Sequence, residues 1–226
     1  MVDLQGSVVL VVGASGVLGS LVSGLLVDAG ATVLRAGRSA DSLAGEDTFL
    51  ADLTTEDSAK ALVATSLAAH GRLDGLVIAA GVVAFGPANE VTDATLHQLF
   101  EINTLAPIRL IREVVPALAA SKAAGGSPFV VTMSGIVSEV PTAGLAAYSA
   151  SKAGLAAFVQ ASSRELRRFG IRMLDSRQGH TETGLADRAI AGEAPNFAPG
   201  LEPAEVAARI VRAIVDEEKD LPSTAF

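Results

Sequence analysis

The sequence contains no cysteine and no run of basic residues. Without cysteine, the 226-residue chain has no disulfide, no thiolate metal site and no cysteine nucleophile. This absence fits a reducing compartment, so we expect a cytoplasmic protein. The net charge is −8 and the 17 lysines and arginines are dispersed, which argues against a nucleic-acid partner. The three histidines show no metal-ligand spacing, so we expect no metal.

Charged residues are also missing from Leu4 to Val27, a stretch long enough for a membrane helix. Its composition argues against that interpretation, because it holds five glycines and four serines and follows Asp3 rather than a basic segment. We interpret it as a strand, a glycine turn and a helix, and expect neither a signal peptide nor a membrane partner.

Half of the residues are hydrophobic, which excludes intrinsic disorder, and the length fits one domain. Short apolar runs alternate with helical patterns, which predicts an α/β fold with a parallel sheet covered on both faces, in a single domain over 1–226. The expected strands are Ser7–Val12, Ala31–Ala36, Thr48–Ala51, Leu73–Ala79, Ser127–Met133 and Ile171–Asp175. The expected helices are Val17–Ala29, Thr55–His70, Thr92–Ala120, Leu145–Phe169 and Pro203–Val215.

Three further expectations concern irregular segments. Pro107 and Pro116 should kink or divide the helix that contains them. The stretch Thr183–Gly200 is rich in Ala, Gly and Pro and predicts a loop or a lid. Leu221–Phe226 is a candidate edge strand.

The first expected strand runs into glycines at 13, 16 and 19, after which a helix begins. In this context Gly13 permits a tight turn, Gly16 lets the backbone approach a pyrophosphate, and Gly19 lets the helix pack on the strand. The helix N-terminus offers N–H groups and a positive dipole to phosphates. The loop therefore predicts a dinucleotide site.

The end of the second strand favours NADP(H), with NAD(H) as the alternative. No carboxylate stands where a ribose-binding acid would lie, and Arg38 offers a charged fork suited to a phosphate. Asp52, after the third strand, either accepts a hydrogen bond from the adenine amine or caps the helix Thr55–His70.

The single tyrosine of the chain, Tyr148, lies four residues before Lys152, one of only four lysines. Residues at i and i+4 share a helix face, and a nearby ammonium lowers the pKa of a phenol. Lys152 is therefore expected to make Tyr148 a usable proton donor to a carbonyl or acceptor from an alcohol.

The loop and this pair together resemble the short-chain dehydrogenase/reductase family over nearly the whole chain. The resemblance implies a Rossmann-type, doubly wound sheet in three αβα layers, hydride transfer between a nicotinamide and a small carbonyl or alcohol substrate, and a homodimer or homotetramer. By the resemblance Tyr148 is the general acid/base, Lys152 also holds the nicotinamide ribose, Asn103 anchors a proton-relay water, and Ser134 orients the substrate oxygen. The residues expected to bind the cofactor are Gly13, Ser15, Gly16, Val17, Leu18, Gly19, Arg38, Ser39, Asp52, Leu53, Ala79, Ala80, Gly81, Asn103, Tyr148, Lys152, Gly179, Thr181 and Thr183.

The chain departs from the family pattern at several positions. The glycine spacing is that of the divergent branches, and Ile78-Ala79-Ala80-Gly81 and Gln178-Gly179 replace the usual Asn-Asn-Ala-Gly and Pro-Gly. The usual spacing from serine to tyrosine falls on Gly135, one residue after Ser134 and three before Ser138, and Ser138 is the alternative for the serine role.

Two other functions stay open at this point. In the first, the chain is a non-catalytic NADP(H)-binding sensor or scaffold. In the second, it is an isomerase or dehydratase with bound cofactor. The residues expected to line the substrate site, Val82, Val83, Ile136, Val137 and the segment 180–200, are mostly apolar and name no substrate.

Overall fold

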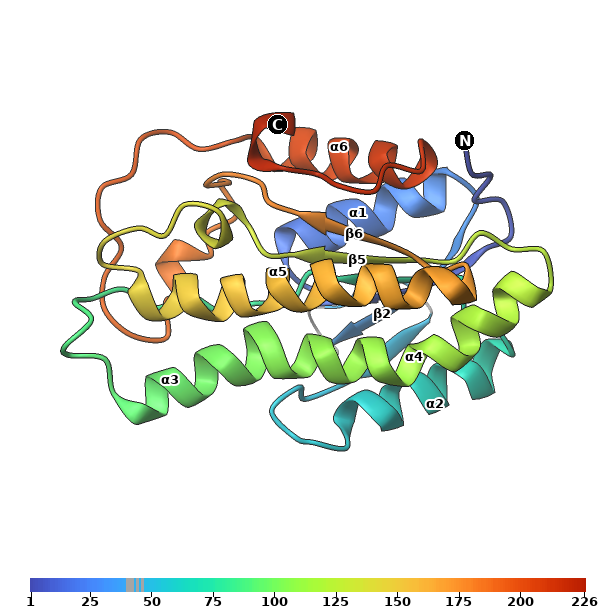
Figure 1. Cartoon of the computed structure of the whole chain (residues 1–226), viewed down its shortest axis with the longest axis horizontal. Coiled ribbons are helices and arrows are strands. Elements are labelled where there is room, and N and C mark those ends of the chain that lie inside the picture. Colours follow the sequence, from blue (N-terminus) through green and yellow to red (C-terminus); the bar gives the residue numbers. More distant parts are fainter. Residues whose placement is uncertain (40–42, 44, 46) are drawn as a thin grey trace.

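The computed structural model describes residues 1–39, 43, 45 and 47–226, and a six-stranded parallel sheet forms its centre (Figure 1). The strand order is β3-β2-β1-β4-β5-β6. The strands are β1 (Val8–Val12), β2 (Thr32–Gly37), β3 (Thr48–Leu50), β4 (Gly75–Ile78), β5 (Phe129–Met133) and β6 (Arg172–Ser176). All six predicted strands are confirmed, with small shifts at their ends.

Because every pair of strands is parallel, the carboxyl ends of all six lie along one edge of the sheet. Val12 at the end of β1 is level with Ala36 of β2 and Ile78 of β4. Met133 at the end of β5 is level with Ser176 of β6. The chain order changes direction between β1 and β4, and the crevice beside such a point is where open α/β sheets bind ligands.

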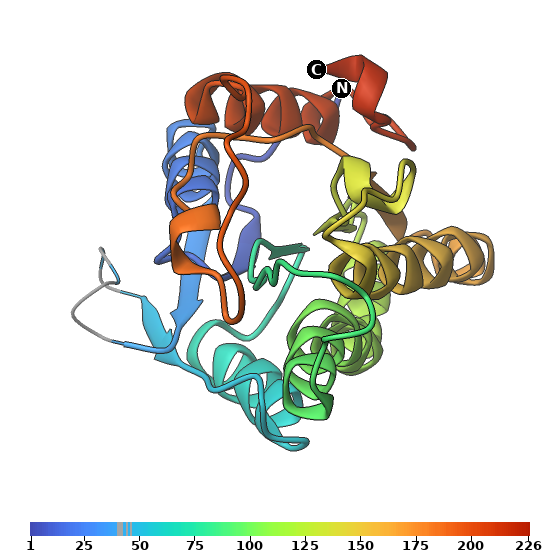
Figure 2. The same ribbon diagram turned by 90° about the vertical axis from the view of Figure 1, so that its left-hand side faces the viewer.

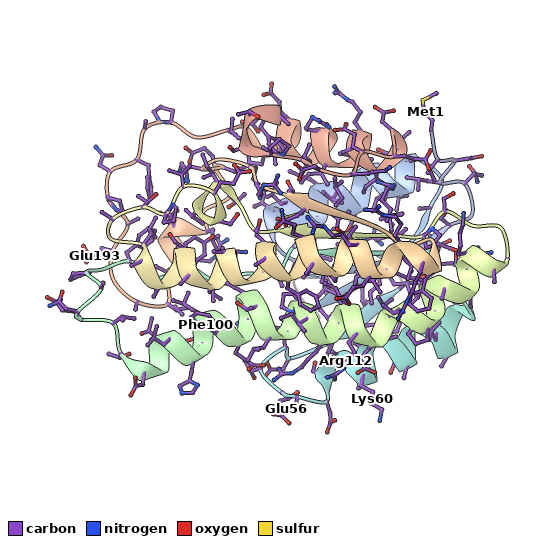
Figure 3. All side chains as sticks on the ribbon, in the orientation of Figure 1. Met1, Glu56, Lys60, Phe100, Arg112 and Glu193 are labelled. Atoms are coloured by element: carbon purple, nitrogen blue, oxygen red, sulfur yellow. The ribbon has the colours of Figure 1, made fainter. Side chains whose placement is uncertain are left out.

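Helices cover both faces of the sheet, which explains why the central strands are apolar on both sides (Figures 1 and 2). One face carries α1 (Val17–Asp28) and α6 (Pro203–Val215). The other carries α2 (Ser58–His70), α4 (Ala106–Ala123) and α5 (Ala146–Leu166). Charged side chains on the outer sides of α2 and its preceding turn, Lys60 and Glu56, point away from these layers (Figure 3). The predicted three-layer Rossmann-type fold is confirmed.

The region predicted as one helix over Thr92–Ala120 consists of three pieces. It begins with α3 (Asp93–Phe100), continues through the π-helical turn η2 (Glu101–Leu105), and ends as α4. Pro107 lies in the first turn of α4, directly after the π-helical turn, and is buried. Of the kink or division expected at Pro116, the division is wrong, because α4 continues through this residue.

Two other expected boundaries are corrected. Helix α2 begins at Ser58 rather than Thr55, because residues 52–57 form turns. The edge strand expected at Leu221–Phe226 is reduced to one bridge between Leu221 and Ser176, followed by the 3-10 turn η6 (Ser223–Ala225). Pro222 explains the short pairing, since it has no N–H to donate.

The segment 183–200 is irregular apart from the 3-10 turn η5 (Ala186–Arg188), as its composition predicts. Within the described residues, no helix is both long and apolar enough to cross a membrane.

Candidate functional site

The glycine loop joins β1 to α1 in the close packing that its spacing predicts. Gly13 has φ +85, and a Cβ there would lie 2.5 Å from the backbone nitrogen of Ala80. A Cβ on Gly19 would overlap the backbone oxygen of Gly13. Gly13 and Gly19 are therefore required by the backbone conformation and by the contact between α1 and the loop.

The N-terminus of α1 has the properties of an anion site. Gly16 is the N-cap, in an extended conformation, with no side-chain cap and no acidic residue in the first turn. Gly16 and Val17 are exposed. The uncapped N–H groups and the dipole of the helix suit a phosphate group, so the loop fits the pyrophosphate of a dinucleotide.

The groups expected to distinguish NADP from NAD lie at the end of β2. Arg38 and Ser39 are exposed directly after this strand. Hydrogen bonds from Thr54 lower the pKa of Asp52, and the charge of Arg38 adds a smaller effect in the same direction. The Asp52 carboxylate accepts hydrogen bonds from the Thr54 backbone N–H at 3.0 Å and from the Thr54 hydroxyl at 2.8 Å. Asp52 thus forms a turn and is not the cap of α2, whose N-cap is Asp57. Leu53 is buried beside it.

Asn103 is fixed by the π-helical turn η2 and is fully buried. Its side chain accepts from the Val82 N–H at 3.0 Å and donates to the Val82 carbonyl at 2.9 Å. It also donates to the Ser151 hydroxyl at 3.0 Å. These bonds tie α5 to the loop that follows β4, and Ser151 is a residue of the site that the sequence analysis missed.

The Lys152 ammonium lies beside Asn103 at the same loop. It donates to the Met133 carbonyl at 2.7 Å, and the lysine is almost completely buried. A Cβ on Gly81 would be 3.3 Å from both the Lys152 nitrogen and the Asn103 amide oxygen. Gly81 therefore leaves an opening above two polar atoms. Burial lowers the pKa of Lys152 to about 8, although the charge of Asp175 opposes that shift.

Tyr148 occupies the first turn of α5, one turn before Lys152. The Lys152 nitrogen is 6.0 Å from the centre of the phenol ring. The pKa expected from this neighbour is not what the structure shows, because burial raises the pKa of Tyr148 to about 12. Desolvation of the phenolate is the cause of this rise.

The serine favoured from the sequence, Ser134, faces away from open space. It is 0% exposed, and its hydroxyl donates to the Asp175 carboxylate at 2.5 Å. The alternative, Ser138, is partly exposed and lies 3.1 Å from the Ser134 hydroxyl. The preference for Ser134 over Ser138 is thus not supported.

The segment after β6 covers the loop that follows β4. The N–H of Ile190 donates to the Val83 carbonyl at 2.8 Å, and the N–H of Phe85 to the Ala191 carbonyl at 2.9 Å. The ring of Phe197 stacks on His180 at 4.7 Å. Gly179, Thr181 and Thr183 lie at the start of this segment, where Thr181 donates to the Gly179 carbonyl at 3.0 Å.

A cavity of about 400 Å³ lies at this segment, lined by His180, Phe197, Leu201 and Phe226 among others. In the described part of the chain, no group of three His, Cys, Asp or Glu residues is arranged to hold a metal. The arrangement therefore offers a dinucleotide loop, a buried ammonium and a phenol, without a metal centre in these residues.

Comparisons with known proteins agree with this geometry. A family model described as short chain dehydrogenase matches residues 7–194. The short chain dehydrogenase ausX of Penicillium brasilianum is 34% identical over 200 residues, which cover 83% of this chain and 74% of that protein.

Two solved structures have similar folds. A short-chain dehydrogenase from Streptomyces avermitilis has a TM-score of 0.85 and 29% identity, covering 96% of this chain and 88% of its own. A metagenomic short-chain oxidoreductase in complex with NADP has a TM-score of 0.79 and 29% identity, with 97% of each chain covered. With the glycine loop, the sheet order and the matched family model, these likenesses show that the chain is an oxidoreductase of the short-chain dehydrogenase/reductase family.

Proposed function

We propose that this protein is an NADP(H)-dependent oxidoreductase that interconverts a small carbonyl compound and an alcohol, with Tyr148 as the general acid/base. The observation that carries the proposal is the placement of the buried Lys152 ammonium beside Asn103 and Gly81, one helical turn from Tyr148. The bound nicotinamide supplies or accepts the hydride. Tyr148 supplies a proton to the carbonyl oxygen, or removes one from the alcohol.

Each of the chain's own residues has a distinct part in this proposal. The loop from Gly13 to Gly19 and the N-terminus of α1 hold the pyrophosphate. Lys152 holds the nicotinamide ribose, and Asn103 keeps α5 against the loop after β4 and anchors a water for proton relay. The segment 180–200 excludes solvent from the reacting groups.

The choice of NADP over NAD rests on Arg38. It is exposed at the end of β2, where no carboxylate of its own strand competes with a phosphate. The similar metagenomic oxidoreductase is in complex with NADP, which supports the same cofactor here. We further propose a homodimer or homotetramer formed through α4 and α5, acting in the cytoplasm.

The test of the reaction uses NADPH with two apolar probes, para-nitrobenzaldehyde and cyclohexanone. Wild-type protein is expected to oxidise NADPH steadily with at least one of them. Tyr148→Phe keeps the ring and loses the proton, so we expect turnover to fall by about 100-fold or more while NADPH still binds. Equal turnover in the variant would contradict the role of Tyr148.

The test of the cofactor compares dissociation constants for NADPH and NADH. Arg38→Ala is expected to weaken NADPH binding by about 10-fold and to leave NADH binding unchanged, because only NADPH carries the second phosphate. Arg212→Ala, an exposed arginine on α6, is the matched control. An unchanged NADPH/NADH ratio in Arg38→Ala refutes the phosphate role.

A second function, cofactor binding without turnover, is favoured by one observation. The hydroxyl of Ser134 is committed to Asp175, and the next residue is Gly135. Tight NADPH binding by a protein that reduces none of a broad panel of aldehydes and ketones supports this sensor function over the reductase.

A further inference from the structure

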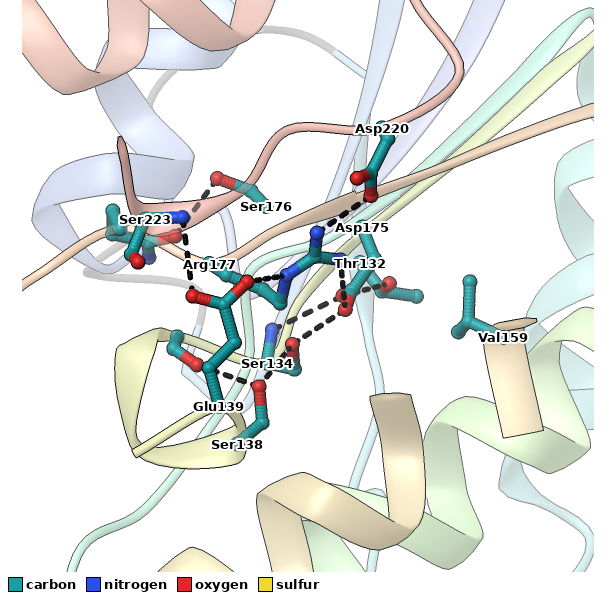
Figure 4. Close-up of polar contacts among 12 residues, drawn as sticks. Thr132, Ser134, Ser138, Glu139, Val159, Asp175, Ser176, Arg177, Asp220 and Ser223 are labelled. Atoms are coloured by element: carbon teal, nitrogen blue, oxygen red, sulfur yellow. Dashed lines mark hydrogen bonds and ion pairs between the residues drawn. The ribbon is translucent and has the colours of Figure 1, made fainter. Parts of the chain in front are cut away.

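A buried carboxylate on β6 lies behind the candidate site and has no part in the proposed reaction. Asp175 is 5% exposed. It accepts from the Thr132 hydroxyl at 2.6 Å, from the Ser134 hydroxyl at 2.5 Å and from the Ser134 N–H at 3.3 Å (Figure 4). A charged group buried in a sheet is costly unless it is bonded in this way.

The charged groups around Asp175 come from two elements. The Arg177 guanidinium on the same strand end is 3.6 Å away and also bonds Glu139 and Asp220. Burial lowers the pKa of Lys152 on α5, and the Asp175 carboxylate opposes this effect. Burial raises the pKa of Asp175, while Ser134, Thr132 and Arg177 oppose that rise.

Counting protons distinguishes the two serines. A serine hydroxyl has one proton, and that of Ser134 is donated to the Asp175 carboxyl group. Its oxygen therefore accepts from Ser138, which lies 3.1 Å away and is also 2.7 Å from the Gly135 carbonyl. The proton of Ser138 is thus shared between two neutral acceptors, and it is the one that a new acceptor can capture.

The backbone explains why Ser138 reaches this place. Gly135 has φ +72, and its N–H donates to the Ser176 carbonyl at 3.1 Å. The following turn η3 (Ile136–Ser138) packs against α5, the helix that carries Tyr148. It brings the Ser138 hydroxyl back to the Ser134 hydroxyl (Figure 4).

We propose that Asp175 and Ser134 are positioning residues that hold the hydroxyl of Ser138, and that Ser138 donates the hydrogen bond to the carbonyl oxygen of the substrate. This inference rests on the proposed reductase function. It moves the role expected of Ser134 to Ser138 and gives Ser134 and Asp175 a supporting one.

The experiment measures NADPH oxidation with para-nitrobenzaldehyde and, separately, NADPH binding without substrate. Ser138→Ala is expected to lower kcat by about 100-fold with unchanged NADPH affinity, the usual effect of removing one donor to a developing oxyanion. Ser138→Thr keeps a hydroxyl and is expected to restore most of the rate. Ser163→Ala, which removes a hydroxyl from the far end of α5, is the matched control and should keep full rate.

Asp175→Asn tests whether Asp175 helps to position the Ser138 hydroxyl. It is expected to lower kcat more than it changes KM, and to shift the alkaline limb of the pH–rate profile to lower pH, because the variant removes the charge that keeps Lys152 protonated. Loss of structure alone does not move that limb. Full turnover in Ser138→Ala, or an unchanged pH profile in Asp175→Asn, overturns the inference and leaves the proposed function intact. Absence of turnover in the wild type overturns both.

Discussion

At the scale of the residue, the pKa values of Tyr148 and Lys152 show how a site can contain the expected side chains without the expected electrostatics. Lys152 has a pKa of about 8 and Tyr148 one of about 12 in the protein alone. In the protein alone, the pKa of the Lys152 ammonium therefore lies below that of the Tyr148 phenol. The identities and spacing of the pair were predictable from the sequence, whereas these pKa values depend on burial, which the sequence does not specify.

The phenol offers a direct measurement, because the chain has one tyrosine and no tryptophan. Near pH 10 the tyrosinate absorbance of the folded protein is expected to stay close to zero, while the urea-unfolded protein shows about half of the full signal. A pKa raised in the folded state also means that stability falls as the pH rises from about 10 toward 12. Tyr148→Phe is the blank, and a folded protein half ionised near pH 10 contradicts the burial of the phenol.

Lys152→Met is expected to separate stability from activity. A lysine with a lowered pKa in the folded state destabilises the protein fully below pH 8, and this cost disappears as the pH rises from about 8 to 10.5. At pH 7 the variant should therefore be more stable to urea by about 1–3 kcal/mol, allowing for the lost bond to Met133.

The difference in stability between Lys152→Met and wild type should narrow as the pH approaches 10.5. Turnover is expected to fall in the variant, because the ammonium proposed to hold the nicotinamide ribose is gone. Equal urea stability of the two proteins at pH 7 contradicts a desolvated ammonium.

At the scale of the element, the π-helical turn η2 is the feature that the sequence pattern did not indicate. It turns Asn103 inward, where the side chain bonds Val82 and Ser151. Periodicity predicted helix on both sides and Pro107 predicted a division, but a π-turn has no residue signature of its own. Such turns occur often at functional sites, in accord with the position of Asn103.

The two prolines of α4 give an internally controlled prediction. Pro116 lies inside the helix on an exposed side and removes one backbone hydrogen bond. Pro116→Ala is expected to raise the free energy of unfolding by about 1–3 kcal/mol, measured in urea. Pro107→Ala should give no such gain, because Pro107 is buried beside the π-helical turn and the substitution removes packed atoms. Equal effects of the two substitutions contradict this account.

At the scale of the whole molecule, the carboxyl ends of the strands carry the candidate site, whereas the amino ends carry a buried hydrogen-bond network at Asp74. The alternating pattern predicted the parallel strands and their layers, because each strand is apolar enough to be buried on both faces. It did not predict that residues 190–191 bond to the loop at Val83 and Phe85, since a loop's partner depends on packing between distant segments. The carboxyl ends carry the candidate site, with its buried Lys152 and Asp175.

At the amino ends of the strands, the hydrogen bonds of Asp74 stabilise the fold. Asp74, just before β4, accepts from the Val8 N–H at 2.8 Å, from Arg72 at 2.7 Å and from Ser121 at 2.5 Å, so it joins β1, β4 and α4. These bonds hold the pKa of Asp74 below its ordinary value, although burial opposes them. An aspartate with a lowered pKa stabilises the folded state above its unfolded pKa, and this contribution is lost as the pH falls through the folded value.

Asp74→Asn is therefore expected to lower the free energy of unfolding by about 2–4 kcal/mol at pH 7, because it leaves buried partners imperfectly bonded. The difference from wild type should shrink as the pH falls below about 4, where the wild-type carboxylate takes up a proton. NADPH affinity should be unchanged at temperatures where the variant is folded, since Asp74 lies at the opposite end of the strands from the glycine loop. Urea unfolding at pH 7 and pH 3.5 measures the loss of stability and its pH dependence. NADPH titration of the folded variant measures the affinity. Weaker NADPH binding in the folded variant contradicts the separation of the two ends.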